Sequence, residues 1–565
     1  MSDPAIEIVD LKVSYSGRSR PTLKALSLRI EPGEFVLLTG PTGCGKSTLL
    51  KAVNGLIPHV LGGTVEGRVA VDGIETRHAP MSALSQKVGL VFQNPEDQIF
   101  STMVLDEVAF GPENLALPRE EIRRRVEAAL DAVGLDELGH RGTQMLSGGQ
   151  KQRLAIGSVL SMAPDILLLD EPFAQLDPRG TREVLEVVRK LNAQGMTVIL
   201  VEHRIHEVID AVDRVVVMDR GRIALEGEPR RVFEKSELLG RLGIRIPDSV
   251  ELSWKMGFDE VALNLADVQR KLNGHGGVEA VHGNSPSWSG RTFRPLPDDP
   301  VLEAESVTFR YDRKKDAILD NVSLTVRKGE MVALMGNNGS GKSTLLHHFA
   351  GLLKPGSGTV RVCGQDIRKS SPWKLAGEVG IVFQNPTLML FNETVREEMA
   401  FGPRALLMDE TASARTVSEI ADRLGVVPLE RDNPLALSGG QRLRVALAAI
   451  LTLRPAVVLL DEPTSGQDRG NCDSLLEYLR SLSRRGVTVL FSTHDVDAAI
   501  RYSERLVVMN DGKIIADDAP GEIVRRGDIL EQACLRPPLS FEIGRLLNIE
   551  AFTCEELLGR VTCSS

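Results

Sequence analysis

The sequence predicts an α/β fold that is built twice in tandem, and three observations support this prediction. Each half opens with alternating apolar residues, as a strand with one buried face does. Continuous apolar runs follow at 166–169 and 457–460, with helical patterns around them, and a parallel sheet covered on both faces requires such runs. The third observation is a repeat.

The two halves are copies of one another. Gln93 and Gln384 lie 291 residues apart. The same separation holds for Ser147 and Ser438, Glu171 and Glu462, and His203 and His494. Upstream the separation is 296, from Lys46 to Lys342, because the first copy is longer around residues 58–63. A period this long indicates tandem domains rather than a solenoid.

The repeat extends beyond the α/β part of each half. Arg245, Pro247, Ser249 and Glu251 recur as Arg536, Pro538, Ser540 and Glu542. Each half is therefore expected to end in an accessory helical segment. Residues 273–300 are rich in Gly, Ser and Pro and are expected to be a flexible linker. The expected division is a first α/β domain at 1–232, an accessory segment at 233–272, the linker at 273–300, a second α/β domain at 301–524 and a C-terminal accessory segment at 525–565.

Composition indicates a soluble globular chain of 565 residues without a nucleic-acid partner. The hydrophobic and charged fractions, 42% and 25%, are ordinary, and the net charge is −10, whereas binding to nucleic acid needs a basic surface. No stretch reaches the roughly 18 apolar residues that span a bilayer. The six cysteines form no CxxC pair, so neither a metal cluster nor a disulfide framework is expected. Any membrane role is therefore expected to come through a partner.

Two glycine-rich loops match the phosphate-loop pattern G-x-x-x-x-G-K-S and lie between an apolar strand and a helix. Glycines let backbone N–H groups converge on phosphate oxygens, the lysine reaches the β and γ phosphates, and the serine hydroxyl coordinates Mg²⁺. The residues expected to bind nucleotide are Gly40, Pro41, Thr42, Gly43, Cys44, Gly45, Lys46, Ser47 and Thr48 in the first copy, and Gly336, Asn337, Asn338, Gly339, Ser340, Gly341, Lys342, Ser343 and Thr344 in the second.

Each half ends an apolar strand with an Asp-Glu pair, Asp170-Glu171 or Asp461-Glu462. An aspartate at the carboxyl edge of a sheet, beside a phosphate loop, is placed to hold Mg²⁺ directly or through water. The neighbouring glutamate can polarise the attacking water, which typically contributes about 10²–10⁴-fold to the rate.

A Leu-Ser-Gly-Gly-Gln motif precedes a helical run in each half. Its members are Ser147, Gly148, Gly149 and Gln150, and Ser438, Gly439, Gly440 and Gln441. With this motif the chain resembles the ATP-binding cassette (ABC) ATPases, and the resemblance covers both halves. It implies two tandem P-loop ABC nucleotide-binding domains at 1–232 and 301–524. It also implies that the signature serine of one cassette binds the γ-phosphate of ATP held by the opposite cassette, in an intramolecular cassette dimer.

The same resemblance implies roles for further positions. Gln93 and Gln384 would contact Mg²⁺ and the lytic water, so the implied metal ligands are Ser47, Gln93 and Asp170, and Ser343, Gln384 and Asp461. The implied catalytic residues are Glu171, His203 and Gln93, and Glu462, His494 and Gln384. Tyr15 and Tyr311 occupy the position of the adenine-stacking aromatic, although a strand tyrosine is as often a core residue. Asp177 and Asp468 match the D-loop aspartate.

The segment 91–100, together with 110–114, resembles the ATPases of energy-coupling factor (ECF) type importers for vitamins and for cobalt or nickel. The second copy keeps Asn385-Pro386 but has Thr387 where the first has Glu96. By this resemblance the partners are a transmembrane coupling subunit, docked near Gln93 and Gln384, and a small membrane-embedded substrate-binding subunit. The expected place of the chain is the cytoplasmic face of the cell membrane.

Two alternatives remain. A soluble ABC ATPase that acts on ribosomes or nucleic acid would usually carry a long charged helical linker, which 273–300 is not. A tandem ATPase of a sugar importer commonly has one impaired site, whereas both copies here keep lysine, Asp-Glu pair, signature and histidine. The transported solute cannot be read from this chain, because a separate subunit would bind it.

Overall fold

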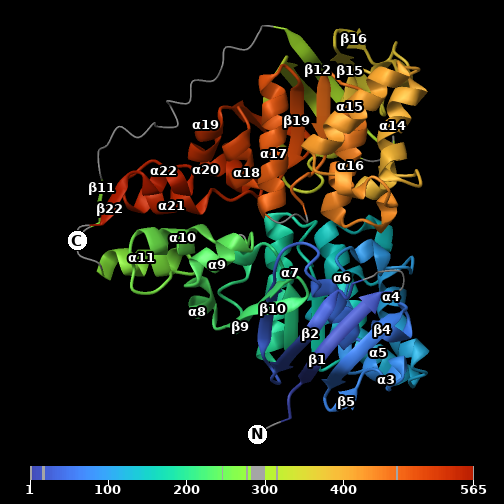
Figure 1. The fold of residues 1–565 in the computed structure, drawn as a ribbon, viewed down its shortest axis with the longest axis vertical. Coiled ribbons are helices and arrows are strands. Elements are labelled where there is room, and N and C mark those ends of the chain that lie inside the picture. The colour runs from blue at the N-terminus through green and yellow to red at the C-terminus, as the bar shows by residue number, and fades with distance from the viewer. Residues whose placement is uncertain are drawn as a thin grey trace. The chain divides into compact units, whose positions relative to one another are not determined.

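The computed structural model describes residues 3–15, 20–244, 246–274, 278–280, 299–312, 316–465 and 469–563. The chain divides into two compact units, Met1–Gly277 and Val278–Ser565. Each unit holds an antiparallel sheet and a mostly parallel sheet with helices (Figure 1).

The first unit has a four-stranded antiparallel sheet in the order β2-β1-β4-β5 and a six-stranded sheet in the order β10-β9-β3-β8-β7-β6. In the larger sheet only β10 runs antiparallel to its neighbour. The strands are β1 (Ile6–Tyr15), β2 (Leu23–Ile30), β3 (Phe35–Thr39), β4 (Gly63–Val71), β5 (Ile74–Glu75), β6 (Val88–Val91), β7 (Ile166–Asp170), β8 (Thr197–Val201), β9 (Arg214–Asp219) and β10 (Arg222–Gly227).

The second unit repeats this plan, with sheets in the orders β13-β12-β15-β16 and β17-β18-β19-β14-β20-β21. Its strands are β12 (Pro300–Phe309), β13 (Leu319–Arg327), β14 (Met331–Met335), β15 (Ser357–Val362), β16 (Gln365–Asp366), β17 (Val379–Val382), β18 (Val457–Leu460), β19 (Thr488–Thr493), β20 (Arg505–Asn510) and β21 (Lys513–Asp518). The α/β fold in two tandem copies is thus confirmed.

The central strands are continuously apolar because both of their faces are buried. In β3, Phe35 and Leu37 belong to the core under helices α6 and α7, whereas Val36 and Leu38 belong to the core shared with the antiparallel sheet and α1. The side chains of a strand alternate between its faces, so only an unbroken apolar run satisfies both cores. β14 divides its side chains between two cores in the same way.

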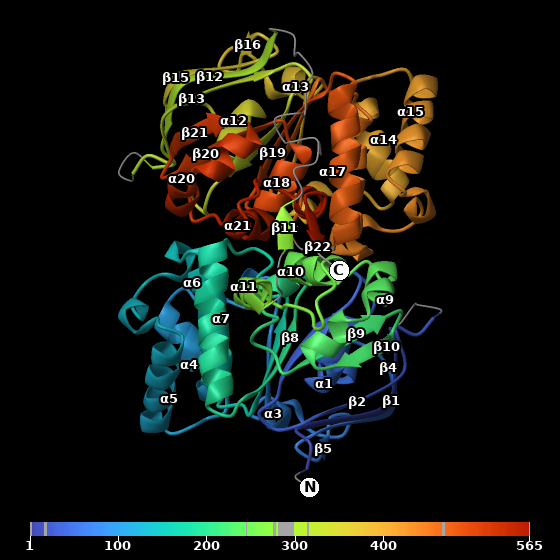
Figure 2. The ribbon, with the colours of Figure 1, turned by 90° about the vertical axis from the view of Figure 1, so that its left-hand side faces the viewer.

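Helices of the first unit follow the strands that they cover. They are α1 (Lys46–Val53), α2 (Leu56–His59), α3 (Met81–Leu84), α4 (Val104–Asn114), α5 (Arg119–Ala132), α6 (Gly148–Leu160), α7 (Pro178–Ala193), α8 (Pro229–Phe233), α9 (Ser236–Arg241), α10 (Asp248–Lys255) and α11 (Leu265–Gly274). Helix α4 packs against α5 and α6 in a group of three helices beside the sheet (Figure 1), while α7 packs against α6 and β8 (Figure 2).

The second unit has a matching set of helices. They are α12 (Lys342–Phe349), α13 (Pro372–Leu375), α14 (Val395–Ala405), α15 (Glu410–Arg423), α16 (Gly439–Leu451), α17 (Arg469–Arg484), α18 (Val496–Tyr502), α19 (Pro520–Arg525), α20 (Gly527–Gln532), α21 (Leu539–Leu546) and α22 (Cys554–Leu558). Helices α14, α15 and α16 form the corresponding group of three. None of the helices in the described part of the chain is both long and apolar enough to cross a bilayer.

The structure differs from the expected division in two places. Residues 278–280, expected within the flexible linker, form strand β11 (Val278–Ala280), which pairs antiparallel with β22 (Val561–Cys563). Its partner strand lies at the far end of the chain, so the local sequence pattern does not predict this pairing. Linker residues 273 and 274 belong to α11, residue 300 begins β12, and 275–277 and 281–298 lie outside the described residues.

The expected boundaries at residues 232 and 524 also fall inside helices rather than between elements. Helix α8 packs on β9 and β10, and α19 packs on β20 and β21. Val232 and Phe233 are buried in the core of the first α/β domain. Each α/β domain therefore continues for a few residues beyond the expected boundary, and the accessory helices α9–α11 and α20–α22 follow it.

Candidate nucleotide-binding sites

In each unit the phosphate loop is a tight turn between a central strand and a helix, β3 and α1 or β14 and α12. Gly40 has φ 149°, and a Cβ atom there would lie 2.2 Å from the carbonyl oxygen of Met218. At Gly336, φ is 146° and the same contact, to Met509, is also 2.2 Å. Only glycine fits at these positions, because a side chain would collide with the neighbouring strand.

Both phosphate-loop lysines are buried and curl back over their own loops. Lys46 Nζ donates to the carbonyl oxygens of Gly40 and Pro41 at 2.8 and 3.3 Å. Lys342 Nζ donates to those of Gly336 and Asn337, each at 2.9 Å. An ammonium group held at the centre of such a loop is placed to contact phosphate oxygens.

Two of the three predicted metal ligands of the first unit, Ser47 and Asp170, meet at the end of β7. Ser47 Oγ donates to Asp170 Oδ1 at 3.0 Å. Burial, and then the charge of Glu171, raises the pKa of Asp170 to about 6. Adjacent hydroxyl and carboxylate oxygens are the hard donors that Mg²⁺ prefers, and a cation would relieve the cost of burying this carboxylate. The residues present therefore fit the metal.

Glu171 takes part in a polar cluster with two other predicted catalytic residues. Gln93 Nε2 donates to Glu171 Oε2 at 2.8 Å, and His203 Nε2 lies 3.1 Å from Glu171 Oε1. Burial opposes ionisation of Glu171, but the hydrogen bond from His203 and the charge of Lys46 lower its pKa below the ordinary value. The carboxylate is thus ionised and oriented, as a residue that polarises water must be.

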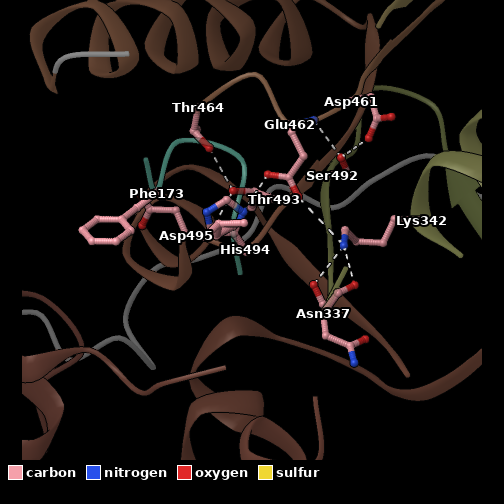
Figure 3. Close-up of polar contacts among 12 residues, drawn as sticks. Phe173, Asn337, Lys342, Asp461, Glu462, Thr464, Ser492, Thr493, His494 and Asp495 are labelled. Atoms are coloured by element: carbon pink, nitrogen blue, oxygen red, sulfur yellow. Dashed lines mark hydrogen bonds and ion pairs between the residues drawn. The ribbon is translucent and has the colours of Figure 1, made fainter. Parts of the chain in front are cut away.

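In the second unit Glu462 takes part in the corresponding polar cluster, but its contacts differ from those of Glu171 (Figure 3). His494 Nδ1 lies 2.9 Å from Glu462 Oε2, and Lys342 Nζ lies 3.9 Å from Glu462 Oε1. Burial opposes ionisation of Glu462, whereas the charge and hydrogen bond of His494 lower its pKa. Among the residues that the structure describes, Gln384 makes no hydrogen bond to Glu462, and its side chain is exposed.

Asp461 is held by a serine that the sequence did not single out. Ser492 Oγ donates to Asp461 Oδ1 at 2.6 Å and accepts from the backbone N–H of Glu462 at 2.8 Å. Burial raises the pKa of Asp461 against the hydrogen bonds from Ser343 and Ser492. The first unit has Val201 at this position, where its carbonyl oxygen accepts from Glu171 at 3.0 Å. Aligning the two copies would have revealed Ser492 as a hydroxyl at a position that is apolar in the other copy.

Both glutamates have a left-handed backbone, with φ 51° at Glu171 and 49° at Glu462. This conformation is strained for a residue with a side chain, at a cost of roughly 1–3 kcal/mol, and such residues cluster at functional sites. The same backbone conformation occurs at the equivalent position of both units, shortly after the end of β7 and of β18.

The signature serines begin helices α6 and α16 through capping boxes. Ser147 Oγ accepts from Gln150 N–H at 3.3 Å, and Gln150 Oε1 accepts from Ser147 N–H at 3.0 Å. Ser438 and Gln441 repeat this at 3.4 and 3.0 Å. Neither serine is hydrogen-bonded to the phosphate loop of its own unit in the described part of the chain. Each signature is an ordered helix N-terminus, a favourable place for an anion.

The remaining predicted residues lie near the phosphate loops or outside the described residues. Tyr15 OH lies 3.2 Å from Thr48 Oγ1, and Tyr311 OH lies 3.4 Å from Thr344 Oγ1. Tyr15 is half-buried, whereas Tyr311 is 62% exposed and so has a ring that a base could stack on. Asp177 Oδ1 caps α7 by accepting from Gly180 N–H at 2.7 Å. Asp468 lies outside the described residues.

The chain is similar to proteins of one family over most of its length. The family model described as ABC transporter matches residues 23–174 and 319–465. A protein of Methanosarcina mazei named as an ABC transporter ATP-binding protein is 46% identical over 98% of this chain and 95% of its own. A protein of Caldanaerobacter subterraneus with the same description is 36% identical over 99% of both chains.

One solved structure is also similar to part of the chain. The structure of CbiO1 from Clostridium perfringens, part of the ABC transporter complex CbiONQ, is 36% identical over 45% of this chain and 100% of that one, with a TM-score of 0.39.

Proposed function

Because this chain belongs to the ABC transporter family and is a transporter ATPase with two cassettes, we propose that it binds two ATP molecules between its cassettes and powers an importer of ECF type. The observation that carries the proposal is the pair of glutamates Glu171 and Glu462. Each is ionised, held by its own histidine and placed beside a phosphate-loop lysine. Both copies therefore have the parts needed for hydrolysis.

The reaction follows from these placements. Lys46 and Lys342 neutralise charge that develops on the transferred phosphoryl group, and the two glutamates orient the attacking water. Mg²⁺ would be held by Ser47, Gln93 and Asp170 in one site and by Ser343, Gln384 and Asp461 in the other, and it would supply further neutralisation of phosphate charge. His203 and His494 keep each glutamate in place and present a ring N–H toward the γ-phosphate.

We assign each ATP to a composite site, with the phosphate loop of one cassette and the signature of the other. In this arrangement Ser438 completes the site of Lys46, and Ser147 completes the site of Lys342. ATP then acts as a bridge between cassettes, and hydrolysis removes the γ-phosphate contacts so that the cassettes part. The capped N-termini of α6 and α16 support this assignment, because each offers backbone N–H groups to an anion.

Two exposed aromatic pairs support docking of membrane partners near Gln93 and Gln384. Phe100 is 61% exposed and packs edge to face on Phe110 with ring centroids 4.3 Å apart. Phe391 is 63% exposed and packs in the same way on Phe401 at 4.8 Å. Aromatic side chains left at the surface in pairs are typical of protein interaction sites.

Buried carboxylates hold these aromatic pairs in place. Glu107 accepts from the backbone N–H groups of Phe100 and Ser101 at 3.2 and 2.8 Å. Glu398 accepts from those of Phe391 and Asn392 at 2.9 and 2.8 Å. Both cassettes therefore present a preformed apolar surface, which suits helices of a transmembrane coupling subunit at the cytoplasmic face of the membrane. A small membrane-embedded substrate-binding subunit completes the proposed importer.

The catalytic assignment is tested by replacing both glutamates with glutamine, as Glu171→Gln with Glu462→Gln. The amide keeps the size of the side chain but cannot act on water as a carboxylate does, so hydrolysis should fall by about 10²-fold or more while ATP still binds. Measurement of phosphate release and of nucleotide binding by equilibrium dialysis checks both expectations. Hydrolysis at the wild-type rate in the double variant would refute the assignment.

The importer assignment is tested by purifying the chain from its native membrane and identifying what accompanies it. Co-isolation of two small polytopic membrane proteins supports the ECF-type importer. Co-isolation of ribosomal subunits instead supports a soluble ATPase, and co-isolation of a larger pair of permease subunits supports the sugar-importer alternative.

A further inference from the structure

Each unit has a docking segment, residues 94–98 in the first unit and 385–389 in the second, which forms a short 3-10 turn that is fixed at both ends. Asn94 Oδ1 accepts from Glu96 N–H at 3.2 Å, and Gln98 joins the turn to β6 by accepting from Phe92 N–H at 3.0 Å. In the second unit Asn385 Oδ1 accepts from Thr387 N–H at 3.0 Å, and Met389 Sδ lies 3.3 Å from Phe383 N. The position of residue 96 or 387 is therefore set by the same turn that leads to the exposed aromatic pair.

A side-chain contact connects this turn to the signature helix in both units. Lys151 Nζ forms an ion pair with Glu96, and Arg442 Nη1 donates to Thr387 Oγ1 at 2.7 Å. Lys151 and Arg442 are the fourth residues of α6 and α16, and each follows the glutamine of the capping box. Their own N–H groups donate to the carbonyl oxygens of Ser147 and Ser438, each at 2.8 Å.

We propose that Glu96–Lys151 and Thr387–Arg442 are positioning links, through which the docking segment of a cassette sets the orientation of its signature serine. The proposal rests on the composite sites proposed above. These contacts form a short chain. The turn fixes residue 96 or 387, and the side chain of this residue contacts the fourth residue of α6 or α16. The backbone N–H of that fourth residue donates to the carbonyl oxygen of the signature serine. Movement of a docked partner would thereby reach the ATP site of the opposite cassette without passing through the catalytic carboxylates.

The two links differ in chemistry. The first joins two opposite charges, with Lys151 18% and Glu96 65% exposed, whereas the second joins one charge to a neutral hydroxyl. Salt screens an ion pair more strongly than a hydrogen bond to a neutral group. The first link should therefore weaken as ionic strength rises, and the second should not.

The test uses the purified full-length chain and measures kcat and KM for ATP, together with the melting temperature. The variants are Glu96→Lys, Lys151→Glu and the charge swap that combines them. Each single change should lower kcat about threefold to fivefold, as expected for a partly exposed ion pair, with KM within about twofold of wild type because the phosphate loops are unchanged. The charge swap should restore kcat to within about twofold. A wild-type kcat in both single variants, or a swap no better than the weaker single variant, would overturn the proposal.

The second cassette provides a complementary test. Thr387→Val removes the accepting hydroxyl and should lower kcat, with a loss that does not change between low and high salt. Thr387→Glu offers Arg442 a carboxylate, so it should retain kcat at low salt and make hydrolysis more sensitive to salt than in the wild type. An unchanged salt response in Thr387→Glu would contradict the proposed role of this pair.

The matched control is the exposed ion pair between Arg123 and Glu120 on α5, 3.2 Å long. Charge reversal of either residue should leave kcat, KM and the salt response unchanged. A merely structural role of the links would instead lower the melting temperature in step with kcat and would overturn the proposal. If the wild-type chain itself hydrolyses no ATP, the proposed function has failed rather than the links.

Discussion

At the scale of single residues, the two carboxylates that end each central strand have opposite tendencies. The pKa of Asp170 is raised to about 6 by burial and by the charge of Glu171, whereas that of Glu171 is lowered by His203 and Lys46 against the effect of burial. Opposite shifts of two neighbouring pKa values indicate that the two carboxylates have different roles. In the proposed sites the aspartate would hold the metal, which compensates its charge, and the glutamate would act on water.

The substitution Asp170→Asn should stabilise the nucleotide-free, Mg²⁺-free chain at pH 7 while abolishing Mg²⁺-dependent hydrolysis. A folded pKa of about 6 against 3.8 in the unfolded chain means that ionisation opposes folding above pH 6, by on the order of 3 kcal/mol. As the pH falls from about 6 to about 4, the wild-type residue becomes protonated in the folded state and this cost disappears.

The measurement is thermal unfolding in EDTA across this pH range. The variant should melt higher than the wild type at pH 7, and the difference should vanish near pH 4. A variant that melts lower than the wild type at pH 7 would show that the buried carboxylate is stabilising.

The sequence predicted most of these residues because each belongs to a motif with a fixed order along the chain. The phosphate-loop motif gives the position of Lys46, and the end of an apolar strand gives the positions of Asp170 and Glu171. The same holds for their counterparts in the second copy. The differences between the two sites could not be predicted in this way. The backbone N–H of Glu462 donates to the side chain of Ser492, whereas that of Glu171 donates to the backbone carbonyl of Val201. A sequence motif does not show which of these two acceptors is used.

At the scale of elements, the phosphate loop depends on glycines in two different environments. At Gly40 a Cβ atom would lie 2.2 Å from Met218 O, whereas at Gly43, with φ 80°, nothing lies within 4 Å. The first glycine is required both by close packing against β9 and by its backbone angle, and the second by its backbone angle alone.

Gly40→Ala should therefore destabilise the first cassette by several kcal/mol and abolish ATP binding there, because the strand or the loop must move. Gly73→Ala is the matched control outside the phosphate loop, with φ 76° and nothing within 4 Å of the added Cβ atom, and it should cost only about 1 kcal/mol and retain binding. Denaturant unfolding and binding of a fluorescent ATP analogue to each variant check this order. Equal effects of the two substitutions would mean that contact with Met218 is unimportant.

Strand and helix patterns predicted both α/β domains, because a central strand that is covered on both faces is a continuous apolar run and is easily recognised. Local sequence patterns did not predict the short strand β11 or the exact ends of the α/β domains. Strand β11 has only three residues, and its partner β22 lies at the far end of the chain, so pairing rather than local pattern decides its conformation. Helices α8 and α19 belong to the cassette because they pack on the two strands at one end of its larger sheet, which the sequence spacing alone does not reveal.

At the scale of the whole molecule, the duplication provides two phosphate loops, two Asp-Glu pairs and two capped signatures in one chain. The proposed pairing needs each signature to meet the phosphate loop of the other cassette. Its direct consequence is that ATP should bring residues of different units together and should leave residues of one unit apart.

Two matched cysteine pairs test this consequence in a chain whose native cysteines are replaced and which carries Glu171→Gln and Glu462→Gln to retain ATP. Thr42→Cys with Ala436→Cys reports the first composite site, and Asn338→Cys with Met145→Cys reports the second. The control pairs Thr42→Cys with Met145→Cys, both within the first unit.

The decisive measurement is thiol crosslinking of these three chains with and without Mg²⁺ and ATP, mapped by proteolysis and mass spectrometry. If each ATP lies in a composite site, ATP induces the 42–436 and 338–145 crosslinks and leaves 42–145 unlinked. A crosslink at 42–145 without the other two, or no response to ATP in any chain, would contradict it.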